Sequence, residues 1–238
     1  MRKFALTVIL STLLGACGGD GGDNTMGSSG VVSPQDVSVP LQTAVANVVM
    51  GGMSVNFSIS GTADNVAVTG NGTLTDTPGV TTTLNGTTVV ETTETMTDTI
   101  VLNGTSEQAT ETMEIFRNPD TFAEVSEDRG GTVVDFPPYT YPASVKPGDG
   151  GTLATGKMFS DNTRTNQTGT VELSYSVDPD TSSSVLVTLK EKDFDSNSVQ
   201  AAEDDRTFEV DTKGKPKHVK DKVKGKHNGH QVDIEDDD

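Results

Sequence analysis

Four oxygen-bearing side chains in the last quarter of the chain have the spacing of a calcium loop. Asp193, Asp195 and Asn197 stand at the first, third and fifth positions of such a loop, and Asp204 stands at the twelfth. Calcium takes oxygen ligands, and the helix–loop–helix calcium sites supply them from these positions. Two positions depart from the pattern, because Ser198 replaces the turn glycine and the twelfth residue is not glutamate. A hairpin loop has the same composition, so both interpretations stay open.

Other site chemistry has less support. No serine lies in a Gly-x-Ser-x-Gly elbow, and no glycine-rich loop carries the lysine and hydroxyl of a phosphate site. His218, His227 and His230 lie in a lysine-rich segment that would repel a dication, which favours a solvated turn over a zinc site. The 35 acidic residues include no pair that stands out for acid–base work. We therefore expect no enzymatic activity and no catalytic residues.

The N-terminal segment has the pattern of a secretory signal. Arg2 and Lys3 form a positive start, and residues 4–14 are almost wholly apolar. This apolar run is too short for a permanent membrane-spanning helix, which needs roughly 20 apolar residues. The segment ends in Leu14-Gly15-Ala16-Cys17, and Cys17 is the only cysteine of the chain. A disulfide within the chain is therefore impossible.

Leu14, Gly15, Ala16 and Cys17 resemble the lipobox of bacterial lipoproteins, in which an aliphatic residue and two small residues precede cysteine. The resemblance implies that residues 1–16 are a signal peptide and that the Cys17 thiol receives a diacylglycerol. It also implies a membrane partner bound through this lipid, since several acyl chains on one residue give a stable anchor. Gly18 stands where aspartate would favour the inner membrane, so the resemblance implies the outer membrane of a bacterial envelope.

The composition of the remaining chain indicates its domain organisation and excludes some classes of partner. Residues 17–33 are mostly glycine, serine, threonine and aspartate, which predicts a flexible tether. The formal net charge of −18 argues against nucleic acid as a partner and against direct adhesion to an anionic membrane. We expect the folded domain over residues 34–212. Residues 213–238 are rich in lysine and histidine and then acidic, which fits either a last hairpin or a disordered tail.

One helix is expected, at residues 41–50. Leu41, Val45, Val48 and Val49 recur at helical spacing, and two glycines follow the run. From Met53 onward the pattern is that of strands, clearest at residues 171–178, where apolar and polar side chains alternate.

A threonine-rich region occupies the first half of the predicted sheet. Between Thr73 and Thr112, 16 of 40 residues are threonine, which predicts strands that are wet on one face. Asparagine–glycine pairs tolerate the backbone of tight turns and predict hairpins. These pairs are Asn71-Gly72, Asn85-Gly86, Asn103-Gly104 and Asn228-Gly229.

The predicted fold is all-β: a single antiparallel meander, as a sandwich or half-barrel, with one short helix near the start of the mature domain. The stiff aromatic stretch at residues 136–142 could rim a pocket, but a plug at one end of the sheet is favoured. The texture "VKPGDGGTLATG" followed by "TGTVELSYSV" resembles uncharacterised bacterial envelope lipoproteins, and this resemblance implies no activity.

The expected function is that of a non-catalytic, lipid-anchored envelope lipoprotein, a structural or binding module at the outer membrane. A periplasmic carrier that holds a lipid or other hydrophobic ligand in a half-barrel cavity is the alternative. An enzyme acting on envelope polysaccharide is a third class, for which the sequence offers only carboxylates.

Overall fold

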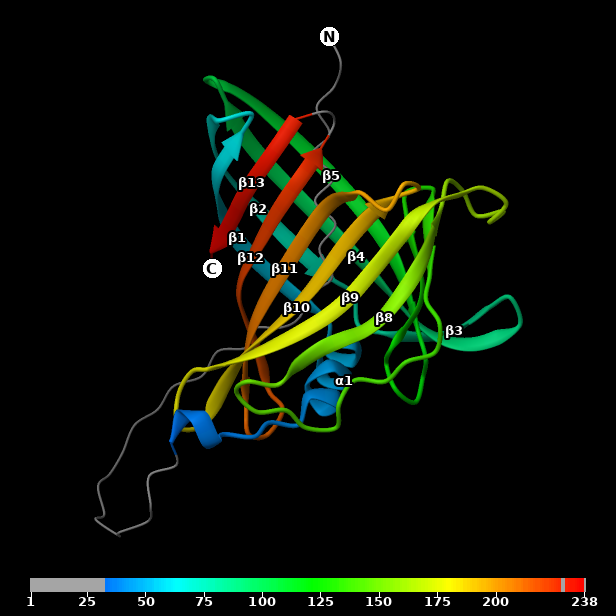
Figure 1. Ribbon diagram of the computed structural model, residues 1–238, viewed down its shortest axis with the longest axis vertical. Coiled ribbons are helices and arrows are strands. Elements are labelled where there is room, and N and C mark those ends of the chain that lie inside the picture. Colours follow the sequence, from blue (N-terminus) through cyan, green and yellow to red (C-terminus); the bar gives the residue numbers. More distant parts are fainter. Residues whose placement is uncertain (1–32, 228–229, 238) are drawn as a thin grey trace.

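The protein is a closed antiparallel barrel (Figure 1). The computed structural model describes residues 33–227 and 230–237. Thirteen strands form one sheet in which β2 also pairs with β4, so twelve of them make a ring and β3 stays outside it. The prediction of an antiparallel all-β fold is confirmed. The sheet closes on itself, however, where a sandwich or half-barrel was expected.

The elements follow one another as neighbours, apart from the crossing around β3. Their bounds are η1 (Pro34–Asp36), α1 (Leu41–Gly51), β1 (Met53–Ala63), β2 (Val66–Asp76), β3 (Val80–Leu84), β4 (Thr87–Leu102), β5 (Thr105–Arg117), β6 (Glu124–Arg129), β7 (Thr132–Asp135), β8 (Gly150–Phe159), β9 (Gln167–Pro179), β10 (Ser184–Asp195), β11 (Gln200–Asp211), β12 (Pro216–His227) and β13 (His230–Asp237).

Two long-range pairings close the ring. The first part of β4 pairs with β3, and its later part pairs with β2, from Glu94 opposite Asp76 to Leu102 opposite Val68. β1 pairs with β13, the last strand of the chain, with Ser60 opposite Glu235. Residues of the lysine-rich tail therefore belong to the barrel as β12 and β13.

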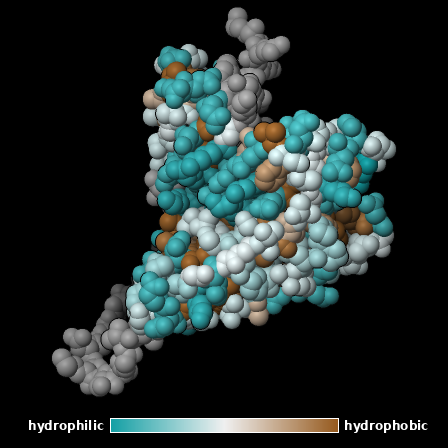
Figure 2. Space-filling model, in the orientation of Figure 1, coloured by the Kyte–Doolittle hydropathy of each residue, from teal (hydrophilic) through white to brown (hydrophobic). Residues whose placement is uncertain are grey.

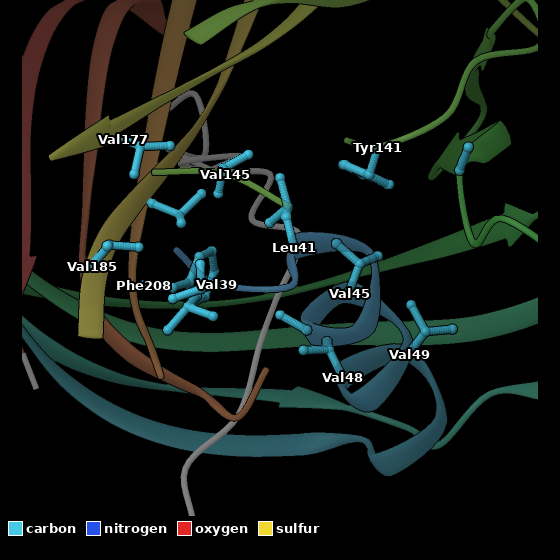
Figure 3. Packing of buried hydrophobic residues seen from close by; sticks show 14 of the residues in the cluster. Val39, Leu41, Val45, Val48, Val49, Tyr141, Val145, Val177, Val185 and Phe208 are labelled. Atoms are coloured by element: carbon cyan, nitrogen blue, oxygen red, sulfur yellow. The ribbon is translucent and has the colours of Figure 1, made fainter. Parts of the chain in front are cut away.

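Helix α1 lies inside one end of the barrel, as Figures 1 and 3 show. The predicted helix is confirmed, because Leu41, Val45, Val48 and Val49 are all buried on its apolar face. They pack in one cluster with side chains from the strand ends, among them Phe208 (Figure 3). This burial stabilises a helix that is too short to persist alone in water. Among the described residues no helix could cross a membrane.

The asparagine–glycine pairs have two different roles. Asn85-Gly86 and Asn103-Gly104 form the β3–β4 and β4–β5 turns, each with positive φ at both residues. The predicted turn at Asn71-Gly72 is wrong, because both residues lie within β2. A side chain at Gly72 would collide with the ring of Phe57, so this glycine serves close packing. Asn228-Gly229 lies outside the described residues.

The aromatic stretch after β7 turns its rings into the molecule. Phe136 and Tyr141 are buried, and Tyr139 lies between them with edge-to-face ring contacts to both. The Tyr139 hydroxyl accepts a hydrogen bond from the Glu124 backbone amide at 3.1 Å. The rings are therefore packed into the interior, and Tyr141 also lines a small cavity there.

Candidate functional site

The barrel interior holds charged side chains where a core would be apolar. We call this set the buried ionic layer; it has eight carboxyl groups, three arginines and one histidine. Its members are Asp76, Glu94, Arg117, Glu124, Glu127, Arg129, Glu191, Asp193, Asp204, Arg206, His218 and Asp221. Buried charges are expensive unless they are paired, so the partners of each arginine decide how the layer is tolerated.

Arg129 is the centre of one ionic cluster. Its side chain is 2% exposed, and its Nε donates to Glu127 Oε2 at 2.9 Å. Its two terminal nitrogens lie 2.8 Å from Glu191 Oε1 and 3.5 Å from Asp193 Oδ2. One guanidinium thus holds three carboxyl groups from two strands, β6 and β10, that are not neighbours in the sheet, so it joins two separate parts of the wall.

Arg206 and Arg117 form two further clusters. The Arg206 Nε donates to Asp221 Oδ1 at 3.1 Å, and the other oxygen of Asp221 lies 3.1 Å from His218 Nε2. Arg117 donates to the Thr92 hydroxyl and lies 3.6 Å from Glu124 Oε1. Each arginine therefore has an acidic neighbour of its own.

Carboxyl groups outnumber arginines in the layer, and several of these carboxyl groups have raised pKa values. Burial raises the pKa of Asp76 to about 6 and that of Glu124 to about 7, with nearby Glu127 raising the latter further. Burial also raises the pKa of Glu94 and Glu191 well above the ordinary value, although arginines oppose it. Burial therefore favours the protonated form of these carboxyl groups, and the arginines favour the charged form.

A small cavity lies within this layer. Its volume is about 40 Å³, enough for a few water molecules, whereas ligand sites typically measure about 300–1,000 Å³. Glu124, Glu191 and Asp204 contribute acidic groups to its lining, Lys190 and Arg206 contribute cations, and Tyr141 and three leucines complete much of the wall. The space is therefore too small for an acyl chain.

The four residues of the predicted calcium loop go to different places. Asp193 and Asp204 are members of the buried ionic layer. Asp195 ends β10, and its Oδ1 accepts the backbone amides of Asn197 and Val199 at 2.8 and 2.9 Å, as in an ordinary polar turn. Within residues 33–227 and 230–237, no group of three or more histidine, cysteine, aspartate or glutamate side chains is placed to hold a metal ion.

The lipobox residues Leu14, Gly15, Ala16 and Cys17 lie outside the described residues. The anchor therefore stays a prediction from the sequence.

The outer surface of β10–β13 is charged. We call its outward residues the charged wall: Lys190, Lys192, Glu203, Asp205, Lys220, Lys222, Lys224, Asp233 and Glu235. Signs alternate from strand to strand, so that lysine faces acid across each boundary, as in Lys190 Nζ to Glu203 Oε1 at 3.1 Å. Figure 2 shows hydrophilic side chains over this part of the barrel.

The outer surface of β1, β2, β4 and β5 has a different chemistry. Strand register places sixteen outward side chains in four rows of four, and none of them is charged. We call this grid the hydroxyl wall. Its rows are Ser54, Thr75, Thr95 and Thr112; Asn56, Thr73, Thr97 and Thr110; Ser58, Asn71, Thr99 and Gln108; and Ser60, Thr69, Val101 and Ser106.

A shallow depression of about 360 Å³ lies in the middle of the hydroxyl wall. Its lining includes the side chains of six uncharged residues from the two central rows: Asn56, Asn71, Thr73, Thr97, Thr99 and Gln108. All six can donate and accept hydrogen bonds, and Phe57 and Gly72 complete the lining, so the depression is uncharged and has both polar and apolar surface.

Sequence reasoning did not find the buried ionic layer or the grid. Residue parity carries the missing information, because Glu94 shares its parity with the buried Met96, and Arg206 shares its parity with Phe208. The threonine-rich composition predicted a wet face, but the rows depend on a pairing of β2 with β4 that skips β3.

Comparisons of this chain with protein family models, with curated proteins and with solved structures found no match.

Proposed function

We propose that this protein is a non-catalytic, lipid-anchored lipoprotein of the bacterial envelope, and that its barrel is a binding module that works through its outer surface. One observation supports the proposal: side chains of the described residues fill one end of the barrel, and the cavity that they leave beside the buried ionic layer is small. Helix α1 fills one end, and the buried ionic layer with its 40 Å³ cavity lies beyond it. We infer that partners bind to the outer surface of the barrel.

The same observation argues against the two alternatives, a carrier and an enzyme. A carrier of a hydrophobic ligand needs an apolar space of several hundred Å³, and the cavity in the layer measures about 40 Å³. An enzyme on envelope polysaccharide needs a pair of carboxyl groups that a substrate can reach, and five of the eight carboxyl groups of the layer are buried. A tethered module needs only a stable scaffold and an exposed face.

The anchor is the part of the proposal that the Leu14–Cys17 motif supports. Cells that express the full chain would be labelled with a palmitate analogue, and their membranes would be separated. We expect label on the wild-type protein in the outer-membrane fraction. Cys17→Ala should take up no label, and Ser29→Ala, another small change in the tether, should label as wild type does. Equal labelling of Cys17→Ala and wild type would refute the lipid anchor.

The binding-module part has its own test. Native mass spectrometry of the purified full chain should give the mass of the protein and its covalent lipid. A further non-covalent lipid retained inside the barrel would favour the carrier instead.

A further inference from the structure

The hydroxyl wall is unusual for an exposed surface of this protein. Lysine, arginine, aspartate and glutamate make up 22% of the chain, and soluble surfaces commonly carry about 25–35% of these residues, which would place about four among sixteen positions. The wall has none. Eight of its positions are threonine, four are serine, three are asparagine or glutamine, and one is valine.

The charged wall and the hydroxyl wall lie side by side, on neighbouring strands. β13 carries Asp233 and Glu235 outward, and β1 lies directly beside it with Ser60 opposite Glu235. The change from charged to neutral side chains therefore falls on one strand boundary. Solubility alone would be served equally well by charges on both sides of that boundary.

The wall is well ordered as a hydrogen-bonding surface. Some hydroxyls pair across strands, such as Thr97 with Thr110 at 3.1 Å and Thr73 with Asn56 at 3.0 Å. A hydroxyl has one donor and two acceptor sites, so one such bond leaves capacity for a second partner. Neighbouring strands lie about 4.8 Å apart and alternate residues about 7 Å apart, which gives the groups a regular two-dimensional spacing.

The uncharged, hydrogen-bonding side chains of the wall favour some classes of partner over others. An apolar partner would bury fifteen hydroxyl and amide groups without hydrogen bonds, at a high cost in free energy. An anionic polymer meets a protein of net charge −18 and finds no cation on this face. A neutral glycan presents hydroxyls that donate and accept as these side chains do, and its C–H faces can lie on the threonine methyl groups.

We propose that the hydroxyl wall binds a neutral polysaccharide, with the depression lined by Asn71, Thr99 and Gln108 at the centre of the site. The inference rests on the proposed function, since it names the partner class of that binding module. The polysaccharide would lie across the four strands and be held by many weak hydrogen bonds.

Affinity electrophoresis of the full chain, in a detergent without a sugar headgroup, tests the proposal. The gels would contain dextran, laminarin or galactomannan as neutral polysaccharides, with polygalacturonate as the anionic control and gelatin as an unfolded polypeptide. We expect at least one neutral polysaccharide to retard the wild-type protein.

Two variants probe the site itself. Asn71→Ala combined with Gln108→Ala removes two hydrogen-bonding groups from the depression, and Thr99→Lys places a charge in it. Each should weaken the retardation at least tenfold. Ser176→Ala combined with Thr188→Ala, a matched outward pair on β9 and β10, should bind as wild type does. Thermal melting of each variant verifies that the barrel is folded.

The other outcomes overturn the proposal. Retardation by none of the three neutral polysaccharides, or by polygalacturonate alone, contradicts it, and so does retardation that both site variants leave unchanged. Retardation by gelatin alone would assign the wall to a protein partner. These results are independent of palmitate labelling, so the site can fail while the anchor holds, and the reverse.

Discussion

Strand β10 carries charges on both of its faces, and the two faces obey different energetics. Lys190 and Lys192 point outward into the charged wall, where their side chains are 27% and 29% exposed. Glu191 and Asp193, the residues beside them in sequence, point inward to Arg129. Water screens the outer pairs and lets each charge be solvated alone. On the inner side Arg129 and Glu127 are almost fully buried, and the side chains of Glu191 and Asp193 are 15% and 21% exposed, so the inner cluster depends more on its partners.

Removing a cation from the interior should cause the largest loss of stability. Arg129→Met should lower the free energy of unfolding by about 3–5 kcal/mol, because three carboxyl groups lose their shared partner in a buried site. Chemical denaturation at neutral pH measures this. Arg164→Met is the matched control, since Arg164 pairs with Asp135 but its side chain is 29% exposed. Similar losses in the two variants would contradict the distinction between the faces.

Between pH 5 and pH 7.5, a change of pH acts on the inner face. The folded-state pKa of Glu124, about 7, lies above its ordinary value of 4.5, so the folded state binds the proton more tightly than the unfolded state. Its stabilising effect is complete below about pH 4.5 and is lost as pH rises through 7. Thermal unfolding should therefore show a more stable barrel at pH 5 than at pH 7.5.

The Glu124→Gln variant sharpens this prediction. It should remove about 2 kcal/mol of the stability difference between pH 5 and pH 7.5, since glutamine does not titrate. Lys220 and Lys222 lower the pKa of Glu235, so Glu235→Gln should change the pH dependence of stability only below about pH 4.5, where the wild-type carboxylate becomes protonated. A wild-type barrel that gains stability from pH 5 to pH 7.5 would show that the layer does not hold protons.

The outer face should tolerate the loss of a cation. Lys190→Met removes the pairs with Glu203 and Asp205, yet exposed pairs contribute roughly 0–1 kcal/mol. The expected loss is below about 1 kcal/mol by denaturation, and 1 M NaCl should reduce it further. A loss as large as that of Arg129→Met would mean that the charged wall is a structural element.

The smallest effect is expected on the hydroxyl wall. Thr97→Val removes the hydroxyl that lies 3.1 Å from the Thr110 hydroxyl, but water can replace this bond and valine favours strands. The melting curve should correspond to a change within about 0.5 kcal/mol. Such tolerance keeps the polysaccharide experiments interpretable, and a large loss would instead assign the threonine pairs to folding.

Local patterns in the sequence predicted the local elements. The apolar spacing of Leu41, Val45 and Val48 predicted α1, and the alternation over residues 171–178 predicted part of β9. Asn85-Gly86 marked a true hairpin. Asn71-Gly72 has the same letters within a strand, because nothing local distinguishes a turn glycine from one that makes room for the Phe57 ring.

Closure and the interior were beyond this kind of prediction. Whether a meander closes depends on the pairing of β2 with β4 and of β1 with β13, which no short window contains. The buried ionic layer depends on closure, since Arg129 meets Glu191 across the barrel and the two are far apart in the sequence. The residues of the calcium pattern do not form one group, because Asp193 and Asp204 face inward from β10 and β11, whereas Asp195 ends β10 and its side chain accepts backbone amides of the following turn.

The seam between β1 and β13 sets the timing of folding. Ile59, in the first strand, finds its partner in Asp236, almost at the end of the chain. The ring can therefore close only after β13 has been synthesised and is free to pair with β1.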